Sequence, residues 1–141
     1  MNSTYQLFVY GSLRSGFQYA AYQYISRYFH LVGNATVKGK LYDNGEYPVA
    51  LPTEEEKFIT GELYEITNAS EFSYAIGQLD DYEGLYAEAG ETPLYKRETV
   101  TVYCNNQQYT AWIYWFNGTV DGLSEIETGD VVLYLQQKNK L

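Results

Sequence analysis

Residues 5–16 read YQLFVYGSLRSG, and this stretch decides how the fold begins. Its first half, residues 5–10, is apolar on both faces of an extended backbone, which predicts a strand in the interior of a sheet. The second half is a loop bracketed by Gly11 and Gly16. Apolar residues then recur at helical spacing from Phe17 to Phe29, which predicts a helix after the loop.

The rest of the chain carries further strand and helix signals. We expect strands at residues 35–42, 58–66, 96–103, 108–116 and 131–135, a turn at 43–48, and a second helix at 69–79. Asn68 can cap that helix with Glu71 in the capping-box position, and residues 104–107 (CNNQ) are typical of a hairpin turn. The pattern predicts an α+β fold, a small mixed β-barrel-like sheet with flanking helices. One domain over residues 1–141 is expected, with a core from about 5 to 135 and a polar tail.

Composition narrows the classes of function. The 141 residues carry 9 Lys+Arg against 18 Asp+Glu, a formal net charge of −9, which argues against nucleic acid and anionic membranes as partners. The single cysteine, Cys104, and the single histidine, His30, exclude an internal disulfide and a Cys-pair metal site. They also leave no nucleophile system unless His30 itself serves. Short apolar runs and an N-terminus without a signal-peptide pattern predict a cytoplasmic protein, with no membrane contact.

The loop at residues 11–16 has the glycine spacing of a P-loop but not its chemistry. Phe17 and Gln18 stand where a P-loop has Lys and Ser or Thr, so binding of a nucleoside triphosphate is excluded. What remains is a strand-to-helix loop whose backbone N–H groups suit a carboxylate or a developing oxyanion. An ordinary tight turn explains the same spacing, and the two interpretations stay open at this point.

The stretch LDDYEG at residues 79–84 places three carboxylates at the end of the second expected helix. For Asp80 and Asp81 we expect a solvated helix end, and the spacing does not match a calcium-binding loop. Glu83, just past the helix and beside Gly84, is suitably placed to enter a pocket as a general base.

The remaining chemically notable side chains have structural interpretations. Arg97 is expected to pair with a carboxylate at the rim of the sheet, and Glu54, Glu55 and Glu56 to form a solvated loop. His30 and Cys104 have no evident catalytic partner. Trp112, Tyr114 and Trp115 are expected in the core, although the hydroxyl of Tyr114 can face a cavity.

Taken in order, five blocks resemble the gamma-glutamylcyclotransferase-like family, and within it the compact bacterial and gamma-glutamylamine cyclotransferase branches. The blocks are FVYGSL at 8–13 with Gly16, GKLYD at 39–43 with YP at 47–48, GELY at 61–64, LDDYEG at 79–84 and YKR at 95–97. The resemblance implies a barrel-like mixed sheet with a cavity near the first loop. It also implies cyclisation of a gamma-glutamyl group to 5-oxoproline with release of an amine.

The same resemblance implies the site residues. Tyr10, Gly11, Ser12 and Leu13 would bind the substrate, and Glu83 would be the general acid/base. Tyr114, whose hydroxyl can face the cavity, is a further candidate for substrate binding. Because the α-amine of the substrate attacks its own γ-carbonyl, no protein nucleophile, metal or cofactor is needed.

Two other classes of function stay open. The same fold can serve as a non-catalytic module that binds a small acidic or amide metabolite, or as an acidic protein-interaction domain. Chemical change of a bound ligand separates an enzyme from a binding module, and a thermal shift with small molecules separates both from an interaction domain. No motif bears on the oligomeric state or on the identity of the released amine.

Overall fold

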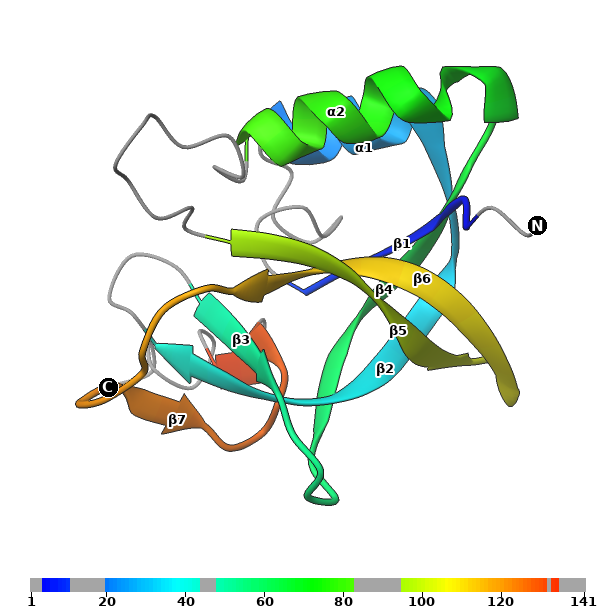
Figure 1. Ribbon diagram of the computed structural model, residues 1–141. Coiled ribbons are helices and arrows are strands. Elements are labelled where there is room, and N and C mark those ends of the chain that lie inside the picture. The colour runs from blue at the N-terminus through cyan, green and yellow to red at the C-terminus, as the bar shows by residue number, and fades with distance from the viewer. Residues whose placement is uncertain (1–3, 11–19, 44–47, 83–94, 132, 135–141) are drawn as a thin grey trace.

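The computed structural model describes residues 4–10, 20–43, 48–82, 95–131 and 133–134. A closed mixed β-barrel forms the centre of the fold (Figure 1). The barrel strands are β1 (Gln6–Val9), β2 (Phe29–Asp43), β4 (Phe58–Ile66), β5 (Tyr95–Cys104) and β6 (Gln107–Phe116). They follow the order β2-β4-β1-β6-β5, and β5 returns to β2 by pairing Cys104 with Ala35. Only the β1–β6 pair is parallel among these neighbours. This agrees with the α+β barrel that the sequence predicts.

The second half of β2 extends beyond the barrel and carries two short strands. β3 (Pro48–Pro52) pairs with residues 39–43 on one edge of β2, and β7 (Ser124–Ile126) pairs with residues 41–43 on the other. A bulge between Leu31 and Gly33 shifts the register of β2 against β4. Such bulges bend a strand, and here β2 must curve around the barrel before it reaches β3 and β7.

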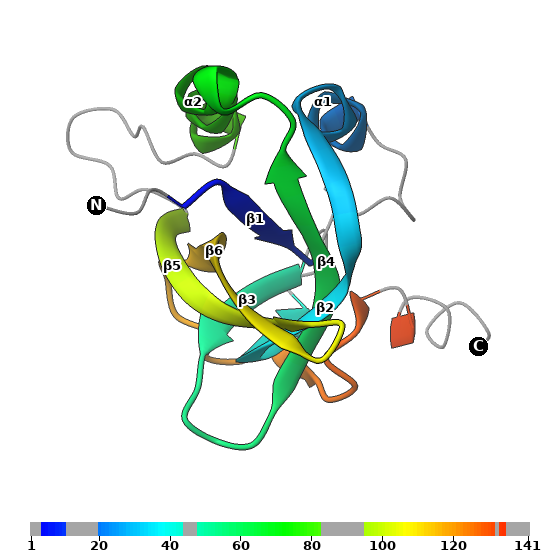
Figure 2. The same cartoon turned by 90° about the vertical axis from the view of Figure 1, so that its right-hand side faces the viewer.

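Two helices lie side by side over one flank of the barrel: α1 (Ala20–Tyr28) and α2 (Phe72–Tyr82) (Figure 2). A short 3₁₀ turn, η1 (Ala69–Glu71), leads into α2, and Asn68 caps it by accepting a hydrogen bond from the backbone N–H of Ser70. The sequence of this helix predicts an apolar stripe of Phe72, Ala75, Ile76 and Leu79. Ala75, Ile76 and Leu79 are buried and Phe72 is half-buried, which confirms the stripe.

The side chains of β1 alternate between two apolar environments. Phe8 of β1 and Ile113 of β6 point into the barrel, whereas Leu7 and Val9 pack in the layer beneath the helices. β1 is therefore covered on both sides, as its continuous apolar sequence predicts. The hairpin between β5 and β6 is also confirmed, because Asn105 and Asn106 adopt φ values of 52° and 63°, as two-residue hairpin turns require.

The structure differs from the sequence prediction in four elements. Where a strand is predicted at residues 131–135, the described residues Val131, Leu133 and Tyr134 are helical, and the backbone N–H of Tyr134 donates a hydrogen bond to the carbonyl of Asp130. β3 and β7 were not predicted, and β2 begins at Phe29 rather than at residue 35. Residues 17–19 of the first predicted helix and the polar tail at 136–141 lie outside the described residues.

Candidate active site

The residues proposed for the site fall into two groups. Gly11, Ser12, Leu13 and Glu83 lie outside the described residues, so their roles stay predictions. Tyr10 and Tyr114 are described, and both are buried.

Tyr10 follows directly after β1 and precedes the loop that begins at Gly11. Its ring packs with the apolar side chains inside the barrel. Its hydroxyl donates a hydrogen bond of 2.5 Å to the backbone carbonyl of Tyr114 in β6. This contact fixes the end of β1 against β6, beyond the point where the two strands pair.

Tyr114 presents its side chain to the opposite face of β6, in the layer beneath the helices. Its hydroxyl donates a 2.8 Å hydrogen bond to Oδ1 of Asp80 in α2. One residue of β6 therefore contacts both Tyr10, through its carbonyl, and Asp80, through its hydroxyl. Its expected role in substrate binding stays a prediction.

Asp80 is buried, with 3% of its surface exposed, which corrects the expectation of a solvated helix end. Arg97 of β5 holds it in a two-pronged ion pair, with Nε 2.7 Å from Oδ1 and a terminal guanidinium nitrogen 3.0 Å from Oδ2. The guanidinium also lies over the ring of Trp112, 4.3 Å from the centroid. The predicted pairing of Arg97 with a carboxylate is thus confirmed. By contrast, Asp81 is exposed, as expected.

A second buried carboxylate, that of Glu62 in β4, is not among the site residues that the sequence predicts. It is 5% exposed, accepts a 3.0 Å hydrogen bond from the hydroxyl of Tyr64, and stands opposite Val9 in the β1–β4 register. The signal was an acidic residue inside an otherwise apolar strand, within the GELY block. Its position is one strand away from the end of β1, which leads to Tyr10.

The other titratable candidates lie away from this region. His30 is exposed, 3.4 Å from a carboxylate oxygen of Glu65, and burial raises the pKa of the Cys104 thiol. No group of three or more His, Cys, Asp and Glu side chains that could hold a metal ion occurs within the described ranges.

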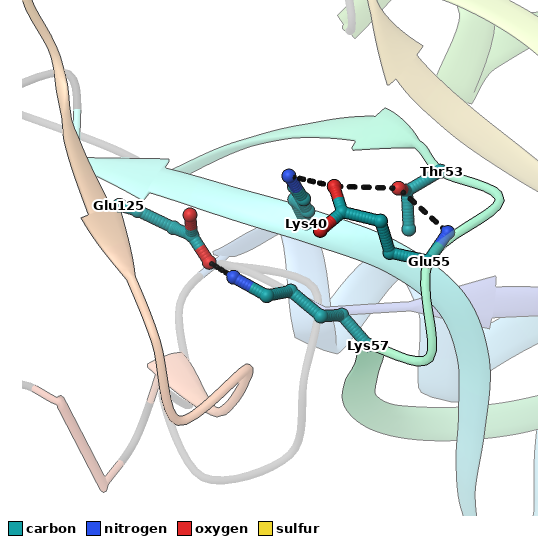
Figure 3. A network of polar contacts seen from close by, with 5 residues as sticks. All are labelled: Lys40, Thr53, Glu55, Lys57 and Glu125. Atoms are coloured by element: carbon teal, nitrogen blue, oxygen red, sulfur yellow. Dashed lines mark hydrogen bonds and ion pairs between the residues drawn. The ribbon is translucent and has the colours of Figure 1, made fainter.

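The acidic loop at residues 54–56 is exposed but not free of partners (Figure 3). Glu55 pairs with Lys40 of β2, and Glu125 of β7 accepts a 2.7 Å hydrogen bond from Lys57. The Lys40 hydrogen bond lowers the pKa of the Glu55 carboxyl, and that carboxylate raises the pKa of Lys40. These pairs join β2, β7 and the β3–β4 connection, and form a structural feature rather than a site.

Comparison with known proteins decides the family. The model of the family described as "Gamma-glutamyl cyclotransferase, AIG2-like" matches residues 7–133. The chain belongs to this family. It is also 31% identical, over 89% of its length and 94% of the relative, to the gamma-glutamylcyclotransferase family protein YtfP of Escherichia coli K12. Membership indicates an enzyme of the cyclotransferase class.

Two solved structures share the fold of this chain. The solution structure of YtfP from Escherichia coli has a TM-score of 0.61 at 30% identity, covering 90% of this chain and 96% of that one. YkqA of Bacillus subtilis has a TM-score of 0.73 at 24% identity, covering 99% of this chain. This chain covers only 44% of YkqA, and the similarity to YkqA concerns the fold alone. Among the described residues of this protein, no helix is both long enough and apolar enough to cross a membrane.

Proposed function

We propose that the protein is a gamma-glutamyl cyclotransferase that converts a gamma-glutamyl peptide or amine to 5-oxoproline and a free amine. The observation that carries this proposal is the family match across residues 7–133, which spans both segments proposed for catalysis. Both segments lie outside the described residues, and each follows directly after a described element. Gly11 follows Tyr10 at the end of β1, and Glu83 follows Tyr82 at the end of α2.

The reaction needs proton transfer rather than a protein nucleophile. The α-amine nitrogen of the substrate attacks its own γ-carbonyl carbon, which forms the five-membered ring and places negative charge on the carbonyl oxygen. The bond to the departing nitrogen then breaks, and that nitrogen takes up a proton. Holding the amine near the carbonyl within one molecule avoids much of the entropic cost of a bimolecular reaction.

Glu83 is the proposed carrier of the proton. Its carboxylate accepts a proton from the attacking amine and returns it to the departing nitrogen, so the enzyme ends the cycle unchanged. The segment from Tyr10 to Leu13 is proposed to bind the substrate, with backbone N–H groups positioned for its carboxylate or for the developing oxyanion. Loss of one such donor in an enzyme typically costs about 3 kcal/mol of transition-state stabilisation.

The proposal is tested by incubating the protein with a panel of gamma-glutamyl compounds and detecting 5-oxoproline by mass spectrometry. The panel contains free gamma-glutamyl amino acids, glutathione-derived peptides and a gamma-glutamyl-lysine isopeptide. We expect product from at least one class, with the released amine in equal amount. Ligand binding without chemical change across the whole panel would instead support a binding module.

A further inference from the structure

The ion pair between Asp80 and Arg97 is unusual in its location. Asp80 and Glu62 are the buried charged side chains among the described residues of the core. Moving a carboxylate and a guanidinium out of water is costly, and well-packed apolar side chains commonly stabilise such a place as well or better. Fold stability alone is therefore a weak reason for this pair.

The geometry of the pair restricts orientation more than a simple ion pair does. Arg97 contacts both oxygens of Asp80, and the hydroxyl of Tyr114 adds a third hydrogen bond to Oδ1. Two-pronged guanidinium–carboxylate pairs fix the plane of both groups. The last turn of α2 is thereby fixed in position and rotation relative to β5 and β6.

The same network also reaches Tyr10, the described residue that leads into the proposed substrate-binding segment. The carbonyl of Tyr114 accepts the hydrogen bond from Tyr10, and the hydroxyl of Tyr114 donates to Asp80. Asp80 lies three residues before Glu83, and Tyr10 lies one residue before Gly11. Tyr114 thus joins the described residues that lead into both proposed segments of the active site.

We propose that Asp80, Arg97 and Tyr114 form a positioning network that holds the last turn of α2 and the end of β1, from which the proposed acid/base and substrate-binding segments continue. The network rests on the proposed function and adds to it residues that need not touch the substrate. Displacement of a reacting group by about 1 Å can cost on the order of a hundredfold in rate. Disrupting the network should therefore lower kcat far more than it raises KM.

The first test compares Asp80→Asn with Asp81→Asn. Both remove one negative charge from the same turn of α2, but Asp80 is buried in the network and Asp81 is exposed. For Asp80→Asn we expect kcat to fall about ten- to a hundredfold with KM changed less than about threefold, and for Asp81→Asn no change in either. Equal kcat values for folded Asp80→Asn and wild type would overturn the proposal.

Two more variants separate positioning from stability and from charge. Arg97→Lys keeps the positive charge but cannot contact both oxygens in one plane, so kcat should still fall. Val102→Ala removes buried volume inside the barrel, away from the network, so it should lower the melting temperature without lowering kcat. A kcat that follows the melting temperature across all variants, Val102→Ala included, would show a merely structural role.

Hydrogen exchange measured by mass spectrometry tests the network without relying on catalysis. Asp80→Asn should increase exchange in peptides from both motif segments, residues 79–86 and 9–14, whereas Asp81→Asn should increase it in neither. Increased exchange around residue 80 alone would overturn the proposed link to the first loop. Absence of 5-oxoproline with wild-type protein, combined with coupled exchange, would refute the proposed reaction while leaving the network intact.

Discussion

Gly61 lies in β4 where that strand passes close to β1, and an alanine there should disturb the approach to Tyr10. A Cβ at this position would lie 2.2 Å from the Val9 carbonyl oxygen and 2.6 Å from Cζ of Phe8. Real Cβ contacts essentially never fall below 3.0 Å, so the Val9 carbonyl would have to move by about 0.8 Å. Because β1 is held between β4 and β6, its backbone cannot swing aside as a flexible side chain can.

The expected cost follows from this geometry. Overpacking a well-packed core costs about 1–3 kcal/mol, and a clash with backbone belongs to the upper part of that range. In a protein of 141 residues, 1 kcal/mol corresponds to a change of about 3–4 °C in melting temperature. We therefore expect Gly61→Ala to lower the melting temperature, measured by circular dichroism or calorimetry, by roughly 6–12 °C.

Gly77 of α2 provides a matched control. A Cβ there meets no atom within 4 Å, and alanine is a better helix former than glycine. Gly77→Ala should therefore stabilise the fold by about 0.5–1 kcal/mol and raise the melting temperature by roughly 2–4 °C. The reasoning is refuted if Gly61→Ala melts within about 1 °C of wild type, or if both substitutions lower the melting temperature equally.

Two further predictions concern pH and thiol chemistry. The pKa of Glu55 is lowered and that of Lys40 is raised. Their ion pair therefore stabilises the fold fully between the ordinary pKa of a Glu carboxyl, about 4.3, and that of a Lys amine, about 10.4. This stabilisation is lost as the pH falls through the lowered pKa of Glu55 or rises through the raised pKa of Lys40. Lys40→Met should therefore lower the melting temperature at neutral pH, and this difference should shrink as the pH falls through the lowered pKa of Glu55. A difference that stays constant with pH would contradict the assignment. Cys104 is buried where β5 pairs with β2, and burial raises the pKa of its thiol. Alkylation of Cys104 in the folded protein should therefore be on the order of a hundredfold or more slower than alkylation of the protein unfolded in urea. Equal alkylation rates in the folded and unfolded protein would contradict the pairing of β5 with β2 around Cys104.

The elements with strong periodic patterns were predictable from the sequence. Residues 5–10 are apolar on both faces because β1 separates the barrel interior from the helix layer. The Asn105–Asn106 turn and the apolar stripe of α2 have equally direct local causes.

The missed elements lack such patterns. β3 is five residues long and begins and ends with proline, which local rules assign to turns, yet it pairs along the exposed edge of β2. β7 has only three residues and depends on β2 for its pairing. At residues 131–134 the β-branched residue Val131 favours a strand, but the Asp130 side chain accepts a 3.3 Å hydrogen bond from the N–H of Leu133 and so stabilises a helical turn.

Besides the buried Glu62, the burial of Asp80 is a feature of the candidate site that the sequence does not predict. A carboxylate at a helix end is usually solvated, and its partner Arg97 is distant in sequence. One signal was present: Asp80 lies four residues after Ile76 and so continues the apolar face of α2. Only the closure of the barrel brings β5 and β6 beneath that face, which turns the acid into a buried partner.

The most direct measurement is mass spectrometry of the product formed in water labelled with heavy oxygen, using wild type and Glu83→Gln. Cyclisation takes no oxygen from water, so wild type should give unlabelled 5-oxoproline and an equal amount of free amine. Glu83→Gln, with an unchanged melting temperature, should give none because it cannot carry the proton. Labelled glutamate from wild type would show hydrolysis instead of cyclisation, and undiminished 5-oxoproline from Glu83→Gln would contradict the assigned acid/base.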